Sequence, residues 1–302
     1  MARAGRSPTA RLLLLVLGIL VVTSILSPGV AWLTRELGFD FKFSRVWNRC
    51  FQVLLVVGLL ATWRRLELGA GADGIGIVSP TWRRDLGLGL MVGFAGIGVG
   101  LLACWLGGAL VPDLRFDPAK TVWKAALGLA AAIALGFGEE ALFRGILLRR
   151  LMLDFGARWG VVVTTGIYAV VHALRPGSSR DLHMWAGVER TIGIFAPLAE
   201  PAAIASVAGL AGLGALLAFA RIRGASLWLP IGIHAAWVAV FRVGRLFFDI
   251  RKKPAWLIGP GWPPVVGGVG GWIALVISFV VLLLVLKRLR RSDVVPTLAP
   301  AV

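Results

Sequence analysis

The chain has 302 residues, of which 58% are hydrophobic and 16% are charged, and its mean hydropathy is +0.84. A soluble domain carries about 25% charged residues, so this composition excludes a soluble enzyme, a disordered protein and a disulfide scaffold. The formal charge of +17 would suggest nucleic acid in a soluble protein, but in a bilayer protein it indicates loops at anionic headgroups. We therefore expect the lipid bilayer as a partner and no nucleic acid.

Apolar stretches long enough to cross a bilayer recur along the whole sequence. Backbone polar groups in lipid must be satisfied within their own segment, so these stretches are expected to be helices. In chain order the eight predicted segments are Leu12–Leu33, Val46–Trp63, Leu86–Val111, Thr121–Leu142, Trp159–Leu174, Pro201–Ala220, Leu227–Phe248 and Pro264–Leu286. The predicted fold class is all-α, a polytopic membrane helix bundle of about eight transmembrane helices that forms one integral membrane domain over residues 1–302.

Small-residue spacing predicts where these helices pack closely. Glycines four residues apart let two helix backbones approach each other, and within the predicted segments such pairs occur at Gly89 and Gly93, Gly96 and Gly100, and Gly267 and Gly271. The alternation typical of strands is absent, so no sheet is expected. No internal repeat is evident, which argues against a transporter built from duplicated halves.

Two adjacent carboxylates and an arginine stand at the end of the fourth segment. A charge at the centre of a membrane helix costs at least about 2.5–3.5 kcal/mol, so such a group is a candidate functional residue. Glu140 and Arg144 have the i, i+4 spacing and order that favour an intrahelical ion pair, whereas Glu139 points about 100° away. We expect Arg144 to hold Glu140 ionised and Glu139 to take a proton from water. The alternative is that all three only cap the helix at the membrane interface.

Two of the three histidines are also embedded in apolar segments. His172 lies on the fifth predicted segment and His234 on the seventh, whereas His183 lies in a polar loop, where a surface position is expected. A single buried histidine is more often a hydrogen-bonding group between helices. Two of them on different helices, together with a glutamate pair, favour a convergent polar site.

These side chains favour hydrolysis. A glutamate and a neutral imidazole can deprotonate a water together, and a second imidazole can donate to the oxyanion that forms on the attacked carbonyl. Neither a Gly-x-Ser-x-Gly motif nor the His-Glu-x-x-His motif of zinc proteases is present. No metal is expected; zinc bound by Glu139, His172 and His234 is the runner-up, because the ligand types suit it while their spacing is not specific.

In these motifs the chain resembles the CAAX protease and bacteriocin-processing family, which is related to the type II CAAX prenyl endopeptidase. The family pattern is Glu-Glu-x-x-x-Arg, then Phe-x-x-x-His, then His-x-x-x-Asn, each on its own membrane helix. The first motif is complete here, the second has Tyr168 in place of Phe before His172, and the third has Val238 in place of Asn after His234. The resemblance covers about residues 121–248, leaving three N-terminal helices and one C-terminal helix added to this core.

The resemblance implies a glutamate protease. It implies that Glu139 and His172 activate water and that His234 stabilises the oxyanion, while Glu140 and Arg144 support the site. Val238 has no group to donate to the oxyanion, and the loss of one such donor typically costs on the order of 10²–10³ in rate. The hydroxyl of Tyr168 is a candidate replacement.

We therefore expect an intramembrane glutamic endopeptidase that cleaves a peptide bond in a membrane-associated protein or peptide. The first alternative is a catalytically weak or inactive family member that acts as a membrane scaffold or immunity-type protein, which Val238 favours. The second is a transporter or channel whose buried Glu and His residues relay protons. Arginine outnumbers lysine 26 to 6, which favours a GC-rich source and a bacterial inner membrane as the location.

Overall fold

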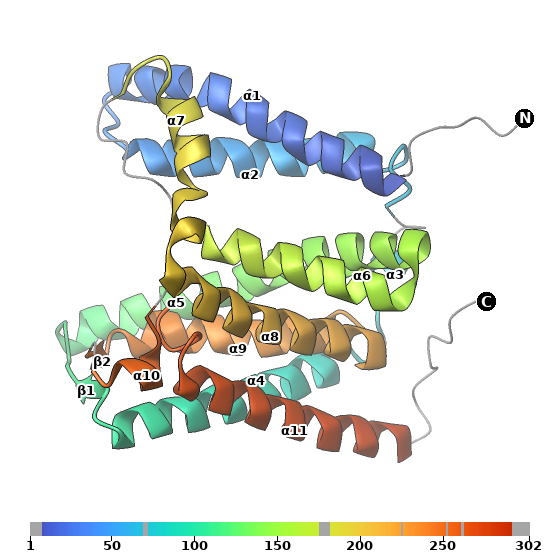
Figure 1. Ribbon diagram of the computed structural model, residues 1–302, viewed down its shortest axis with the longest axis vertical. Coiled ribbons are helices and arrows are strands. Elements are labelled where there is room, and N and C mark those ends of the chain that lie inside the picture. Colours follow the sequence, from blue (N-terminus) through green and yellow to red (C-terminus); the bar gives the residue numbers. More distant parts are fainter. Residues whose placement is uncertain are drawn as a thin grey trace, which may run out of the picture. The chain divides into compact units, whose positions relative to one another are not determined.

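The computed structural model describes residues 8–68, 72–174, 182–224, 226–251, 253–260 and 263–291. Most of these residues are in helices, which confirms the predicted all-α class (Figure 1). The long helices are α1 (Pro8–Glu36), α2 (Phe43–Thr62), α4 (Trp82–Leu106), α5 (Pro118–Glu140), α6 (Leu148–Ala173), α8 (Pro201–Gly224), α9 (Trp228–Gly244) and α11 (Val269–Arg291). The shorter ones are α3 (Ala72–Ile75), the π-helix η1 (Ala141–Leu147), α7 (Ala186–Gly193), the 3-10 helix η2 (Ala196–Ala199) and α10 (Ala255–Ile258).

Each predicted membrane segment overlaps one of the long helices, but Leu86–Val111 and Leu227–Phe248 extend past the helix ends at Leu106 and Gly244. Within the described ranges, six helical stretches are long and apolar enough to cross a membrane. One of them, Pro118–Ala173, contains two of the predicted segments. A break at Gly156 inside α6, where the backbone leaves the helical conformation (φ 79°, ψ 164°), lies between these two segments. The helix α9 is apolar but has only 17 residues. These two facts account for the difference between eight predicted segments and six long stretches.

The sequence analysis is wrong about two kinds of local structure. Its membrane segments stop at Leu142 and resume at Trp159, but the chain between them is also helical apart from Gly156, because Arg150 and Asp154 lower the hydropathy of a helix rather than mark a loop. It also predicts no strands. The three-residue strands β1 (Leu110–Pro112) and β2 (Phe248–Ile250) pair antiparallel, and strands this short show no alternation that a sequence could reveal.

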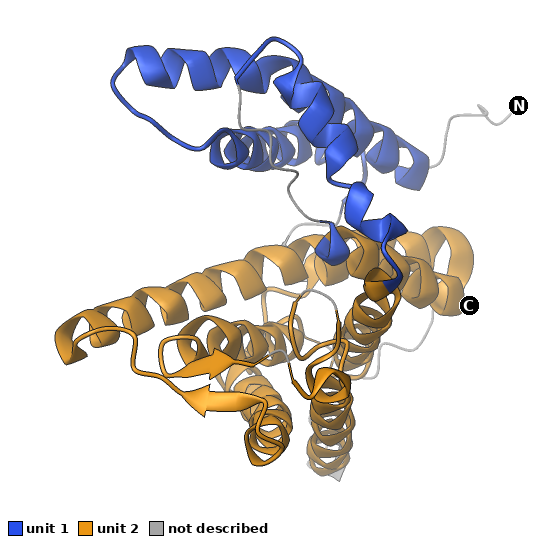
Figure 2. Cartoon of the chain, turned by 60° about the vertical axis from the view of Figure 1, so that its left-hand side comes forward, with its two compact units in different colours: residues 1–69, 172–201 blue, residues 70–171, 202–302 orange. Residues whose placement is uncertain are grey.

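The chain divides into two compact units, of residues 1–69 and 172–201 and of residues 70–171 and 202–302 (Figure 2). In the first unit, α1 packs against α2 and α7. The side chain of Trp47 belongs to its hydrophobic core, and the Ser24 and Thr191 hydroxyls lie 2.6 Å apart. The expectation of one integral membrane domain stays a prediction.

The second unit is organised around α4, which packs closely on α9 and α11. A Cβ at Gly93 would lie 2.6 Å from that of Ala236 on α9, and a Cβ at Gly100 would lie 2.7 Å from that of Ala274 on α11. The first two predicted glycine pairs therefore do allow close helix packing. The third differs, because Gly267 precedes α11 and lies against Ala205 of α8 instead.

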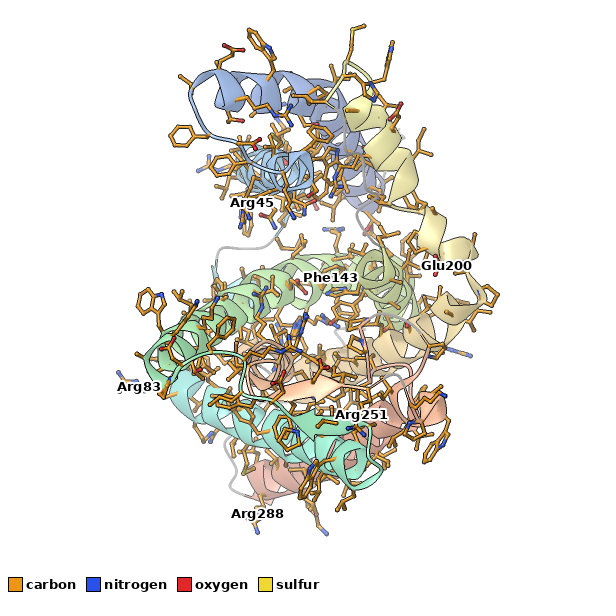
Figure 3. The ribbon with its side chains drawn as sticks, turned by 90° about the vertical axis from the view of Figure 1, so that its left-hand side faces the viewer. Arg45, Arg83, Phe143, Glu200, Arg251 and Arg288 are labelled. Carbon is orange, nitrogen blue, oxygen red and sulfur yellow. The ribbon has the colours of Figure 1, made fainter. Side chains whose placement is uncertain are left out.

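The helices α5 and α9 run antiparallel and form the other main contact of the second unit. A Cβ at Gly136 would lie 3.2 Å from the backbone of Ala235, and a Cβ at Gly128 would lie 3.2 Å from Val243. The end of α5 thus lies near the start of α9. Phe143, just beyond that end, lies inside the unit, whereas Arg83 and Arg288 lie at its periphery (Figure 3).

Candidate active site

The helix α5 carries the two carboxylates at its C-terminal end. Asp117 caps its N-terminus by accepting a hydrogen bond from the backbone N–H of Lys120 at 2.9 Å, and Pro118 occupies the first turn, where a missing N–H costs nothing. The last two residues of α5 are Glu139 and Glu140, and the chain continues directly into the π-helix η1. π-Helical turns are rare and occur frequently at functional sites.

Glu140 and Arg144 form a completely buried ion pair. Nη1 of Arg144 donates to Oε1 of Glu140 at 2.8 Å, and both side chains are 0% exposed. Nη2 of the arginine donates to the carbonyl of Gly214 on α8 at 3.1 Å, and its guanidinium lies 4.4 Å from the ring centroid of Tyr168. The predicted intrahelical pair is therefore present, and it is held from two further helices.

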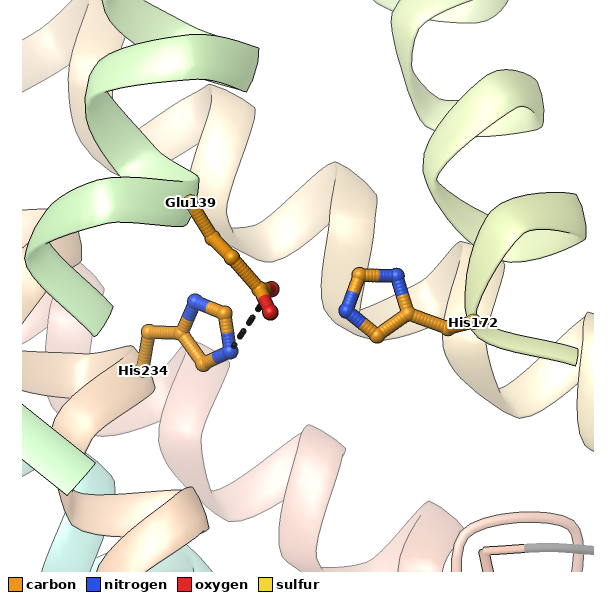
Figure 4. A group of neighbouring side chains, drawn as sticks. All are labelled: Glu139, His172 and His234. Carbon is orange, nitrogen blue, oxygen red and sulfur yellow. Dashed lines mark ion pairs between the residues drawn. The ribbon is translucent and has the colours of Figure 1, made fainter. Parts of the chain in front are cut away.

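His234 lies between the two glutamates, and Figure 4 shows its ring facing Glu139. Its Nδ1 lies 2.7 Å from Oε1 of Glu140, and its Nε2 lies 3.7 Å from Oε2 of Glu139. The ring is buried in the first half of α9, where α9 packs against α5 and α4. The carboxylate of Glu140 therefore orients this imidazole so that its other nitrogen faces Glu139.

His172 completes the group from the last turn of α6. One ligand atom each of Glu139, His172 and His234 lie within 4.8 Å of one another. Glu139 is 24% exposed whereas Glu140 is fully buried, so of the two carboxylates only Glu139 is open to an incoming molecule. The structure therefore brings together the three residues that the sequence suggests for catalysis.

The remaining candidates lie as follows. Tyr168 is buried, with its ring against Arg144 and edge-on to His234 at a centroid distance of 6.1 Å, so the ring supports both side chains. Val238 lies one turn beyond His234 on α9 and lines a cavity between α5 and α9. His183 is 42% exposed and lies 3.1 Å from Glu189, which confirms its expected surface position.

The contact between Glu140 and His234 determines which nitrogen of the imidazole carries a proton. An ionised carboxylate only accepts hydrogen bonds, so Nδ1 of His234 is the donor in this contact. A neutral ring then has a lone pair on Nε2, and Nε2 can donate only when the ring is an imidazolium. The oxyanion role predicted for His234 therefore requires the doubly protonated ring.

The donor set also fits a zinc ion. One carboxylate oxygen and two imidazole nitrogens are the ligands of one class of catalytic zinc site, which leaves a fourth position for water. A ligating histidine commonly donates its other N–H to a carboxylate, as His234 does to Glu140. These residues would hold the metal, and zinc bound in this way lowers the pKa of its water to about 7.

Sequence reasoning missed two supports of the site. The carbonyl of Gly214 accepts a hydrogen bond from Arg144, and Phe143 packs edge-on against Tyr168 at a centroid distance of 5.3 Å. The only available signal for Gly214 is a glycine inside an apolar segment, which favours close helix approach. A Cβ at this position would lie 3.0 Å from Tyr168, so the glycine lets α8 approach that ring.

The fold and the site define a class: a multi-pass helical membrane protein with a buried Glu–Arg pair and a Glu–His–His cluster. Residues 121–240 match the family model described as "Type II CAAX prenyl endopeptidase Rce1-like". The match agrees with the resemblance seen in the motifs, and over these residues it supports membership of the CAAX protease family. No curated protein and no solved structure matches the chain.

Proposed function

We propose that the chain is an intramembrane endopeptidase of the glutamic type, which cleaves a peptide bond in a membrane-associated protein or peptide. The proposal rests on one observation: one ligand atom each of Glu139, His172 and His234 lie within 4.8 Å of one another, beside the buried Glu140–Arg144 pair. The match of residues 121–240 to the family model supports a peptidase at this site.

In the proposed mechanism, Glu139 and His172 position a water and remove its proton as it attacks the scissile carbonyl. The carbonyl oxygen becomes an oxyanion, which accepts a hydrogen bond from Nε2–H of the His234 imidazolium. The proton taken from water then passes to the leaving nitrogen as the peptide bond breaks. Glu140 does not react in this scheme; it holds the Nδ1 proton of His234 and is itself held by Arg144.

Substitution of the water-activating pair tests this mechanism. Glu139→Gln and His172→Ala should each lower peptide cleavage in proteoliposomes at least about 10²-fold, because general acid–base catalysis typically contributes 10²–10⁴-fold. His183→Ala is the matched control, since this exposed histidine lies outside the cluster, and it should leave the rate unchanged. Cleavage that persists in both site variants contradicts the assigned roles.

The zinc variant of the same function rests on the fit of the three ligands. The glutamic mechanism predicts that a chelator leaves cleavage unchanged, so a chelator belongs in the same assay. Loss of cleavage with the chelator and its recovery on adding zinc would show that the metal, rather than Glu139, activates the water.

The rival scaffold role keeps one specific observation in its favour, the replacement of the motif asparagine by Val238. Absence of cleavage in the wild-type protein, with every substrate tested, would favour it over the peptidase. Proton-coupled transport would show instead as a pH-dependent flux in sealed vesicles without cleavage.

From the arginine-rich composition we also propose a bacterial plasma membrane as the location.

A further inference from the structure

A cavity of about 900 Å³ lies between α5 and α9 in the second unit, and none of the three Glu–His–His residues lines it. Its apolar wall includes Leu127, Ala131 and Leu135 of α5 and Val238 and Phe241 of α9. Leu135 and Val238 each lie one helical turn from a candidate catalytic residue on the same helix. The cavity therefore begins near the site and extends along the two helices away from it.

Three cations line the other end of the cavity: Lys124, Arg242 and Arg245. Lys124 makes a cation–π contact with Phe116, and none of the three forms an ion pair with a described carboxylate. The neighbouring Arg115 differs, because Asp249 and Asp113 lie 2.6 and 3.5 Å from it. Positive charge that no described carboxylate neutralises thus gathers at one end of an apolar groove.

The surroundings of this end show what the groove opens onto. Trp123 is 64% exposed and Leu127 is 50% exposed, so the face of α5 beside the cavity is apolar and exposed among the described residues. Tryptophan near the end of a membrane helix is typical of the interface between headgroups and hydrocarbon. This position of Trp123 is consistent with the cations at headgroup level and the apolar part of the groove facing the acyl chains.

The length of the groove fits one leaflet. Lys124 and Leu135 are eleven residues apart on α5, which corresponds to roughly 16 Å along the helix. One half of the hydrocarbon core is about 15 Å thick. A second cavity of about 510 Å³ shares Arg115 and Arg245 with the first and adds Arg251, which gives the basic end additional room.

We propose that the groove between α5 and α9 binds one anionic phospholipid. Its phosphate contacts Lys124, Arg242 and Arg245, and one acyl chain lies along Leu127, Ala131 and Leu135. Length, charge and lateral exposure to the bilayer all match this ligand. Because the acyl chain of the lipid would end next to Val238, the bound lipid forms one wall of the space beside the candidate catalytic residues.

Native mass spectrometry of the purified full-length protein tests the proposal through lipid retention, a readout that does not depend on proteolysis. Phosphatidylglycerol and phosphatidylcholine with the same acyl chains are the two probes. One cation near an anionic headgroup is worth about fivefold in binding, so Arg242→Gln/Arg245→Gln should reduce phosphatidylglycerol retention about 25-fold. The matched control is Arg83→Gln/Arg223→Gln, which removes two arginines that do not line the groove and should leave retention unchanged.

A second variant fills the groove without changing charge. Ala131→Phe should lower retention of phosphatidylglycerol while the midpoint of thermal unfolding in lipid-free detergent stays within a few degrees of the wild type. Equal retention of both lipids overturns the proposal. So does displacement of the lipid by inorganic phosphate alone at millimolar concentration, which would indicate a small-anion site, or equal losses in the groove and control variants.

Discussion

A single oxygen atom, Oε1 of Glu140, accepts hydrogen bonds from two side chains on different helices. Arg144 donates to it at 2.8 Å and His234 lies 2.7 Å from it. The other oxygen, Oε2, is buried and makes no hydrogen bond with the residues that the structure describes. The carboxylate therefore depends on its Oε1 contacts, and removing one partner leaves an uncompensated charge in a buried position.

Arg144→Met removes that partner and should lower the free energy of unfolding by about 3–5 kcal/mol, the usual cost of an uncompensated buried charge. Arg115→Met is the control in the same unit, because Arg115 pairs with Asp249 and Asp113 and these side chains are 34%, 60% and 51% exposed. Its loss should cost about 1 kcal/mol or less. Unfolding in mixed micelles measures both values. Similar losses of unfolding free energy in the two variants would show that the Glu140–Arg144 pair contributes no more to stability than the control pair.

Val238 offers a test in the opposite direction, because restoring the motif asparagine should increase activity. Val238→Asn supplies a donor one turn from His234, and one oxyanion donor is worth on the order of 10²–10³ in rate. We expect a rise in kcat of at least about 10-fold in the peptide cleavage assay. Val240→Asn, on the same helix but outside the motif, should give no rise. A rate unchanged by Val238→Asn would show that the missing donor does not limit catalysis.

At the scale of elements, close packing of α4 on α9 positions His234. A Cβ at Gly89 would collide with the backbone carbonyl of Leu229, whereas Gly87, half a turn away on α4, has nothing within 4 Å of the same position. The two glycines have similar neighbours in the sequence, but only Gly89 faces α9. They therefore separate helix packing from helix propensity.

Gly89→Ala should destabilise the protein by about 1–3 kcal/mol, since overpacking forces the helices apart. Gly87→Ala should be neutral or stabilising, because alanine has a higher helix propensity than glycine. Thermal unfolding in detergent compares the two variants. We also expect Gly89→Ala to slow cleavage, since α9 carries His234. Equal stability of the two variants would be inconsistent with the packing described for α4 and α9.

The elements could largely be predicted from hydropathy, because each membrane segment is a long apolar run. The break at Gly156 and the π-helix could not, since both depend on backbone conformation that hydropathy does not record. In the site, the spacing of Glu140 and Arg144 on one helix was sufficient to predict their pair. The contact of Glu140 with His234 joins residues 94 positions apart, and no spacing rule relates them.

At the scale of the whole molecule, each compact unit contains one free cysteine. Cys50 is half-buried in α2 of the first unit, and Cys104 is fully buried in α4 of the second. The two thiols can therefore report the opening of their units separately. Cys104 lies in the helix that packs on α9, so its protection also reports the integrity of the helix that carries His234.

Thiol labelling at increasing denaturant should modify Cys50 under native conditions and Cys104 only when the second unit opens. Loss of Cys104 protection should coincide with loss of cleavage activity. A Cys50→Ser variant isolates the buried thiol, and mass spectrometry of peptides assigns the label. Labelling of Cys104 at the native rate of Cys50 would contradict the burial described here.

The position of Arg144 on the same helical run as Glu140 has a consequence for biosynthesis. Arg144 leaves the ribosome four residues after Glu140, whereas His234 follows 94 residues later. The carboxylate can therefore be neutralised by its own helix while that helix enters the bilayer, which lowers the cost of inserting either charge alone. The histidine then meets a carboxylate that is already oriented. The order of residues along the chain thus matches the order in which the site can be assembled.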